Sequence, residues 1–226
     1  MPLLSILMPV YNEAKTIKQV LEKINSVNID KEIIIVDDGS TDGSEKLMRE
    51  IRQDNVKIIF HSSNRGKGAA VLTALENATG EFIILQDADL EYDPQDYIKL
   101  MEAMRNDGAD IVLGVRFTKG YSGLLITKLG NRVVTSLVNI LFGARLNDFL
   151  TCYKLLRRDF FNGLKLESQG FDIEAEIIAK ILKRKLRIKQ VPISYHPRDY
   201  RQGKKIRWLD GIRVVITIAK FRISHL

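Results

Sequence analysis

Short apolar runs alternate with amphipathic segments over the first 116 residues of the chain. The apolar runs have the length of strands and end at polar or turn-forming residues. The predicted strands are Leu4–Val10, Glu32–Val36, Val56–Phe60, Phe82–Leu85 and Asp110–Val115. The segments between them have apolar residues at helical spacing, and the predicted helices are Ala14–Asn25, Thr41–Gln53, Gly68–Ala78 and Pro94–Asn106. This alternation predicts an α/β fold with a mostly parallel central sheet and helices on both faces.

The rest of the chain has a less regular pattern. It predicts three helices, Leu124–Phe142, Ile173–Lys185 and Arg207–Ile223. It also predicts two strands, Cys152–Leu156 and Leu186–Tyr195. In the first of these helices the apolar positions form one stripe of Leu125, Leu129, Val133, Leu137 and Leu141. That stripe would either pack on the core or contact a membrane. The chain has no repeat and no clear linker, so we expect a single domain over residues 1–226.

Acidic residues follow the fourth predicted strand, where they form an Asp-Ala-Asp motif. Asp87 and Asp89 end this strand, and Glu91 comes two residues later. Because alternate residues of an extended chain point the same way, the three carboxylates are expected to line one edge of a crevice. Such hard oxygen ligands suit Mg²⁺ or Mn²⁺. The alternative is a solvated acidic turn.

Polar clusters also follow the first two predicted strands. Asp37 and Asp38 could accept hydrogen bonds from a nucleobase or a ribose, or could instead cap the next helix. After the first strand, Tyr11 could stack on a base and Glu13 could reach a ribose. Ligands bind beyond the carboxyl ends of strands in such sheets, so these clusters mark the predicted site.

Charge and composition narrow the choice of partners and compartment. The 226 residues have a net charge of +7, but residues 180–226 alone carry +12. A basic segment of this kind favours a phosphorylated substrate, nucleic acid or an anionic membrane. The single cysteine, Cys152, excludes an internal disulfide framework and predicts a reducing compartment. No apolar run is long enough to span a membrane, and the first residues do not resemble a signal peptide.

The order and spacing of the three strand-end clusters resemble a known family. The motifs Pro9-x-Tyr11-Asn12-Glu13, Asp37-Asp38-Gly39-Ser40 and Asp87-Ala88-Asp89 are similar to those of family 2 glycosyltransferases with the GT-A fold. Later segments resemble the polyprenyl-phosphate branch of that family, which includes dolichyl-phosphate mannosyltransferases. These segments are Gly114–Arg116, Asp148–Arg157, Gly170–Glu174, Val191–Tyr195 and Arg198–Trp208.

The resemblance implies a reaction and a location. The expected enzyme is an inverting, metal-dependent transferase that moves a sugar from a GDP- or UDP-sugar to dolichyl or undecaprenyl phosphate, with Mg²⁺ or Mn²⁺ as cofactor. Residues 1–116 would bind the nucleotide sugar, and residues 117–226 would bind the acceptor. The protein would lie at the cytoplasmic face of a membrane as a peripheral protein. A membrane-embedded subunit is a possible partner. No nucleic acid is expected as a partner.

The resemblance also implies roles for individual residues. The nucleoside would be held by Pro9, Tyr11, Glu13, Val36 and Asp38, with Asp37 as a second candidate. Asp87, Ala88 and Asp89 would hold the nucleotide and its cation, and Glu91 would assist the metal. Arg116 and Arg132 would grip the acceptor phosphate, so that Asp89, Arg116 and Arg132 form the catalytic set. The leaving diphosphate would be neutralised by Arg198, Arg201, Lys204 and Lys205, and either lysine could make this contact.

Three alternatives remain open from the sequence. A sugar hydroxyl as acceptor would need a general base, for which Asp148 is the candidate, whereas a lipid phosphate is already an anion. A nucleotidyltransferase would have a Gly-rich loop where Tyr11 to Glu13 stand. A non-catalytic basic adaptor on the same fold would have no need for Asp87, Asp89 and Arg116.

Overall fold

The computed structural model describes residues 1–117, 125–198 and 208–223. Within this part of the chain, one sheet has the strand order β3-β2-β1-β4-β6-β5-β7. The strands are β1 (Leu4–Val10), β2 (Lys31–Asp37), β3 (Val56–Phe60), β4 (Phe82–Leu85), β5 (Ile111–Val115), β6 (Lys154–Arg157) and β7 (Ile188–Pro192). Strand β6 runs antiparallel to both of its neighbours, and the other pairs are parallel. The predicted fold class is confirmed.

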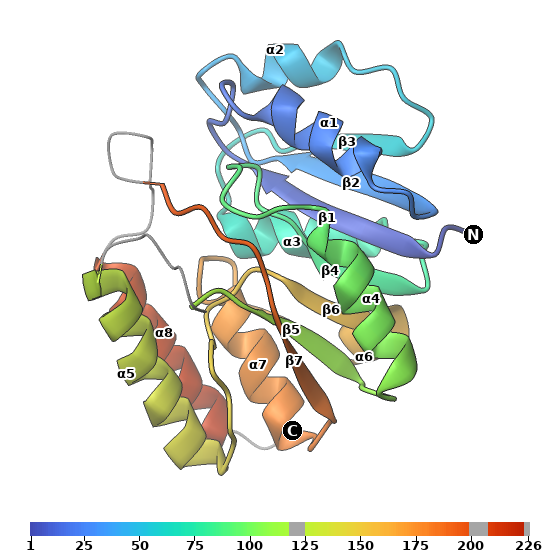
Figure 1. Ribbon diagram of the computed structural model, residues 1–226. Helices are drawn as coiled ribbons and strands as arrows, with labels where there is room; N and C mark the ends of the chain where they lie inside the picture. Colours follow the sequence, from blue (N-terminus) through green and yellow to red (C-terminus); the bar gives the residue numbers. More distant parts are fainter. Residues whose placement is uncertain (118–124, 199–207, 224–226) are drawn as a thin grey trace.

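Helices cover both faces of this sheet. Figure 1 shows α1 and α4 in front of the sheet and α3 and α6 behind it. The helices are α1 (Ile17–Ser26), α2 (Ser44–Arg49), α3 (Lys67–Glu76), α4 (Asp96–Asn106), α5 (Leu125–Phe142), α6 (Arg158–Gly163), α7 (Ile173–Lys183) and α8 (Trp208–Ile223). Because both faces are covered, β4 and β5 are buried at every position and have no polar side. This explains why the strands read as uninterrupted apolar runs.

Two elements differ from the prediction in informative ways. The helix predicted from Thr41 begins only at Ser44, because Gly43 has a left-handed φ of 95° and the Asp42 carboxylate accepts a hydrogen bond from the Ser44 N–H at 2.9 Å. The strand predicted at Cys152–Leu156 is shifted to β6 and is antiparallel. Helix α6, which follows β6 directly, was not predicted, since its six residues are too few to show helical periodicity.

The long helix α5 turns several polar residues toward the protein, among them Asn131, Thr135 and Asn139. Its Asn139 side chain accepts a hydrogen bond from the Leu146 N–H at 2.8 Å and donates one to the Leu146 carbonyl at 2.9 Å. The hydroxyl of Thr135 accepts a hydrogen bond from the Phe149 N–H at 3.2 Å. These contacts satisfy the backbone of the buried loop after α5. As a result Leu129 and Val133, members of the predicted apolar stripe, are each 62% exposed.

Candidate functional site

The loops after β1, β2 and β4 meet at one edge of the sheet, because β1 lies between β2 and β4 and runs parallel to both. The backbone N–H of Asn12 donates to the Ser40 hydroxyl at 2.9 Å, which joins the first loop to the second. The Thr16 hydroxyl donates to the Ala88 carbonyl at 2.7 Å, which joins the start of α1 to the third loop. The structure therefore brings together the three clusters that the sequence marks.

Two of the acidic residues at this edge share one guanidinium group. Arg198 donates to the Glu13 carboxylate at 3.0 and 3.2 Å and to Asp89 Oδ2 at 2.9 Å. Burial, together with the negative charges of Asp87 and Glu91, raises the pKa of Asp89 to about 7, although Arg198 opposes the shift. A further positive charge near Asp89, in addition to that of Arg198, would keep its carboxylate ionised.

The carboxylate of Glu91 anchors the segment that follows β7. Its Oε2 accepts a hydrogen bond from the Tyr195 hydroxyl and its Oε1 accepts one from the Arg198 N–H, both at 2.7 Å. Its carbonyl accepts a third from the His196 N–H at 2.8 Å. Figure 1 shows this segment rising from β7 toward the loops after β1 and β4. Each carboxylate oxygen of Glu91 thus accepts one hydrogen bond and keeps a second lone pair for the predicted part in metal binding.

Asp87 is already neutralised by a half-buried lysine. The ammonium of Lys67 lies 2.7 Å from Asp87 Oδ1 and 2.7 Å from Glu174 Oε1. Lys154, which is fully buried, lies 3.5 Å from the other oxygen of Glu174. Burial would lower the pKa of Lys67, but Asp87 and Glu174 raise it well above its usual value. Two cations and two carboxylates thus alternate along one edge of the site and cancel each other's charge.

Lys67 reaches this position because two glycines flank it. A Cβ atom at Gly66 would lie 2.4 Å from the Gln169 carbonyl oxygen, and one at Gly68 would lie 2.2 Å from the Ser168 carbonyl oxygen. Gly66 also has a left-handed φ of 97°. The Gly-Lys-Gly turn therefore needs glycine for close packing, which directs the lysine side chain into the site.

These contacts decide which residues fit a divalent cation. Within the described ranges, the only group of three metal-type ligands with atoms within 4.8 Å of one another is Asp87, Cys152 and Glu174, and Lys67 already pairs with two of them. A second acidic cluster, of Glu13, Asp89 and Glu91, is spaced more widely than this group, and Arg198 contacts all three of its members. The carboxylates of this second cluster are the hard oxygen donors that Mg²⁺ and Mn²⁺ prefer.

The two aspartates after β2 have different surroundings. The carboxylate of Asp38 accepts hydrogen bonds from the backbone N–H groups of Arg65 and Gly66 at 2.9 and 2.8 Å, and lies 2.7 Å from His61 Nδ1. Asp38 is therefore part of the scaffold in this structure. Asp37 is 1% exposed, and its Oδ1 has no hydrogen-bond partner. Burial raises the pKa of Asp37. Of the two, Asp37 keeps an oxygen that a ligand could use.

The predicted acceptor arginines occupy contrasting positions. Arg116 follows β5 and pairs with Asp148 through two hydrogen bonds, Nε to Oδ2 at 2.8 Å and Nη2 to Oδ1 at 2.9 Å. Its backbone N–H also donates to Asp148, at 3.0 Å. Asp148 is fully buried, which is the environment of a structural carboxylate rather than a general base. Arg132 is exposed on α5. Arg201, Lys204 and Lys205 lie outside the described residues.

The remaining predicted residues lie in the strands or beside the loops of the site. Val36 is fully buried in β2, and Ala88 is 3% exposed. Pro9 and Tyr11 are half-buried at the end of β1. The sequence did not reveal Lys67, Glu174 or Tyr195 as members of the site, because their partners lie far away along the chain.

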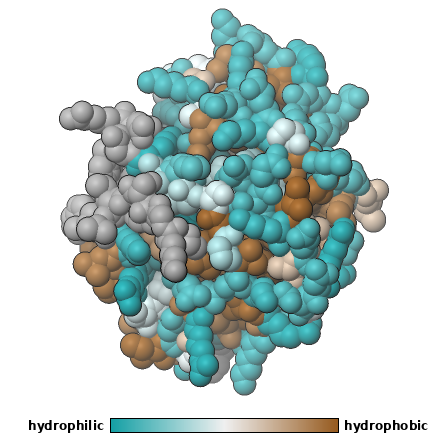
Figure 2. Space-filling view, in the orientation of Figure 1, coloured by the Kyte–Doolittle hydropathy of each residue, from teal (hydrophilic) through white to brown (hydrophobic). Residues whose placement is uncertain are grey.

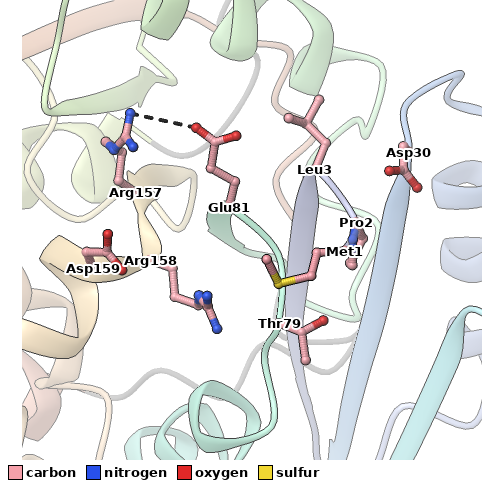
Figure 3. A pocket seen from close by; sticks show the side chains of 9 residues that line it. All are labelled: Met1, Pro2, Leu3, Asp30, Thr79, Glu81, Arg157, Arg158 and Asp159. Carbon is pink, nitrogen blue, oxygen red and sulfur yellow. Dashed lines mark ion pairs between the residues drawn. The ribbon is translucent and has the colours of Figure 1, made fainter.

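A separate hollow of about 390 Å³ lies at the opposite edge of the sheet, beside the amino ends of β1 and β4 (Figure 3). Its charged side chains include Arg157 and Glu81, which form an ion pair at 3.7 Å. None of the predicted site residues lines it. The candidate site is therefore the carboxyl edge and not this hollow.

Comparison with known proteins gives relatives for the sequence. Residues 5–164 match the family model described as Glycosyl transferase family 2. The low-salt glycan biosynthesis hexosyltransferase Agl6 of Haloferax volcanii is 32% identical over 88% of this chain and 49% of its own. The dolichol-phosphate mannosyltransferase of Pyrococcus furiosus is 27% identical over 88% of this chain and 58% of its own. The chain thus spans about half the length of these two relatives.

A third relative has a similar length. The UDP-N-acetylglucosamine–dolichyl-phosphate N-acetylglucosaminyltransferase of Methanococcus voltae is 30% identical over 98% of this chain and 97% of its own. Among solved structures, glucosyl-3-phosphoglycerate synthase of Mycobacterium tuberculosis, in complex with Mn²⁺, UDP and phosphoglyceric acid, superposes with a TM-score of 0.76. It is 18% identical and covers 100% of this chain and 80% of its own, which is a likeness of fold.

Proposed function

Because the chain belongs to glycosyltransferase family 2, we propose that it transfers a sugar from a nucleotide diphosphate donor to a polyprenyl phosphate with the help of Mg²⁺ or Mn²⁺. The observation that carries this proposal is the acidic cluster of Glu13, Asp89 and Glu91, whose three members all contact Arg198. It lies at the carboxyl edge of a GT-A fold, where ligands of such sheets bind.

On the donor side of the site, the acidic residues would have different roles. Asp89 and Glu13 would hold the cation, which supplies stabilisation of the charge that develops on the leaving diphosphate. Asp87, held ionised by Lys67, would accept hydrogen bonds from the nucleotide rather than ligate the metal. The Asp37 oxygen that has no partner would accept one from the base or the ribose.

The residues proposed for the acceptor side, Arg116 and Asp148, favour a phosphate over a hydroxyl group as the acceptor. A sugar hydroxyl would need a general base, and the two oxygens of the candidate, Asp148, are taken up by Arg116. A phosphate monoester needs no such base and is recognised well by arginine. Two relatives of this chain are named for dolichol phosphate or dolichyl phosphate, which agrees with this acceptor.

A donor and acceptor panel tests the proposal directly. Protein incubated with UDP- or GDP-sugars, Mn²⁺ and a polyprenyl phosphate is expected to form a lipid-phosphate sugar that mass spectrometry detects. EDTA is expected to stop product formation. A matched acceptor series would contain the same prenyl chain as a free alcohol and a soluble sugar without phosphate. Product on either of these in place of the lipid phosphate would contradict the proposed acceptor.

We also propose that α5 and α8 rest on the cytoplasmic surface of an anionic membrane. Within the part of the chain that the structure describes, no helix is long and apolar enough to cross a bilayer. Helix α8 buries Val214 and Ile218 but leaves Ile212, Ile216 and Ile223 at 47%, 61% and 80% exposure. Helix α5 leaves Leu129, Val133 and Ile140 exposed, and Figure 2 shows hydrophobic side chains over α5.

Charge favours lipid as the occupant of this apolar face. Arg213 and Lys220 lie on one flank of the α8 stripe, and Arg222 lies on the other. Arg222 also donates to the Leu141 carbonyl at 2.7 Å, which holds α8 beside α5. An apolar stripe between basic flanks is the pattern of a helix that lies in the membrane interface. Each Lys or Arg near an anionic surface adds about 1 kcal/mol of attraction.

Substitution of exposed apolar residues tests this surface. The double variant Val133→Ser and Ile216→Ser is expected to lose most of its flotation with vesicles that contain anionic lipids, because less apolar area enters the interface. Ile98→Ser is a matched control, since Ile98 is 41% exposed on α4, outside the α5–α8 face. Donor binding should stay unchanged in both variants. Wild-type protein that fails to float even at low salt would contradict the membrane proposal.

A further inference from the structure

We propose that Tyr195 is a positioning residue that holds the donor-side Glu91 and the acceptor-side Arg116 in a fixed relation. This inference rests on the proposed function for the assignment of the two sides. Tyr195 lies three residues beyond β7, and its two functional groups face different partners. The phenol hydroxyl contacts Glu91, and the ring lies against the guanidinium of Arg116.

The backbone around Tyr195 is fixed on both sides. The Ile193 N–H donates to the Val115 carbonyl at 3.1 Å, and the Ser194 N–H donates to the buried Asp96 carboxylate at 2.6 Å. Tyr195 itself pairs with Tyr92 as an antiparallel bridge. The rings of Tyr92 and Tyr195 also meet edge to face, with centroids 5.2 Å apart. The side chain of Tyr195 is therefore held in one place by the scaffold.

The hydroxyl of Tyr195 acts on the donor side. It donates to Glu91 Oε2 at 2.7 Å, and Glu91 Oε1 is held by the Arg198 N–H. The Glu91 N–H in turn donates to Asp89 Oδ1 at 3.1 Å. Burial raises the pKa of Tyr195 far above its usual value, so the hydroxyl remains a donor at any working pH. The Tyr195 hydroxyl thus helps to orient the Glu91 carboxylate beside Asp89.

The ring of Tyr195 acts on the acceptor side. The guanidinium carbon of Arg116 lies 5.2 Å from the centre of the Tyr195 ring, within the range of a cation–π contact. Asp148 binds the Nε and Nη2 atoms of the same guanidinium. Asp148 therefore fixes the guanidinium from one edge, and the Tyr195 ring limits its motion from another side. Because the hydroxyl and the ring have separate partners, two substitutions can separate their effects.

The first substitution removes only the hydroxyl. Tyr195→Phe is expected to weaken the binding of UDP or GDP in the presence of Mn²⁺ by about tenfold in calorimetry, because a hydrogen bond to a charged group is lost. The KM for polyprenyl phosphate is expected to stay at the wild-type value, since the ring still contacts Arg116. The second substitution, Tyr195→Leu, also removes the ring and is expected to raise the acceptor KM as well.

A matched tyrosine controls for loss of stability. Tyr153 is fully buried and donates its hydroxyl to Gln86 at 2.7 Å, away from Glu91 and Arg116. Tyr153→Phe is expected to lower the unfolding temperature but to leave nucleotide affinity and acceptor KM unchanged. If Tyr195→Phe leaves nucleotide affinity intact, or lowers both affinities in parallel with the unfolding temperature, Tyr195 has no positioning role.

The same experiments distinguish this inference from the proposed function. Wild-type protein that binds nucleotide with Mn²⁺ but transfers nothing to polyprenyl phosphate would overturn the proposed acceptor, and with it the acceptor half of the Tyr195 inference. The calorimetric comparison of wild type with Tyr195→Phe involves no acceptor. It would still support or overturn the link between the Tyr195 hydroxyl and Glu91.

Discussion

Asp89→Asn is expected to abolish sugar transfer and cation-dependent nucleotide binding while the fold remains intact. Asp89 is a half-buried carboxylate that shares Arg198 with Glu13, and we propose that it binds the divalent cation. Asparagine removes one negative charge from a hard-ion site, and we expect a loss of at least about 100-fold in turnover. Transfer to lipid phosphate and Mn²⁺-dependent nucleotide calorimetry measure the two effects.

The fold should tolerate this substitution for an electrostatic reason. Burial, Asp87 and Glu91 already disfavour the charged form of Asp89, which raises its pKa to about 7. A neutral side chain of the same shape relieves that repulsion, although it weakens the contact with Arg198. Asp54→Asn, an exposed carboxylate before β3, is a suitable control. Wild-type turnover in Asp89→Asn, or full activity of the native protein in EDTA, would contradict the metal assignment.

The strands and the location of the site were predictable because both depend on local pattern and on one topological rule. The runs that became β1, β2 and β4 are each longer than three apolar residues and end at polar clusters. Parallel strands place their carboxyl ends at the same edge, so the clusters meet there. The family match and the fold agree with the predicted α/β arrangement.

The partners of the site carboxylates were not predictable from local pattern. Lys67 and Glu174 are 107 residues apart, and Asp89 and Arg198 are 109 residues apart. Glu174 reads in the sequence as a charge at a helix start or as support for the basic segment. In the structure it lies between two lysines, the half-buried Lys67 and the fully buried Lys154. Such a pairing arises because the fold brings the starts of α3, β6 and α7 together, and no spacing in the sequence encodes it.

The orientation of α5 shows a second limit of sequence patterns. Helical periodicity reveals that Leu129 and Val133 share a face, but it does not say which face is buried. The buried loop after α5 needs hydrogen-bond partners for its backbone, and Thr135 and Asn139 supply them. The polar stripe therefore turns inward. Leu129 and Val133 are left on the surface, where we propose that they meet lipid, whereas Leu141 packs against the core.

Substitution of the two predicted acceptor arginines is expected to have different consequences. Arg132→Ala removes an exposed side chain and should raise the acceptor KM with no change in unfolding temperature. Arg116→Ala should raise the acceptor KM and also destabilise the protein, because it leaves Asp148 buried without its cation. Removal of one partner of a buried ion pair typically costs about 3–5 kcal/mol. Denaturant unfolding and acceptor kinetics measure the two effects separately.

A double substitution separates the structural and functional roles of Arg116. In Arg116→Met with Asp148→Asn, neither side chain is charged, so we expect most of the lost unfolding free energy to return. The acceptor KM should remain as high as in Arg116→Ala, because methionine cannot bind a phosphate. Donor affinity should stay within about threefold of wild type, since Arg116 makes its ion pair with Asp148 and not with the Glu13–Asp89 cluster. If the double variant recovers acceptor affinity together with stability, Arg116 only supports the fold and another group binds the acceptor.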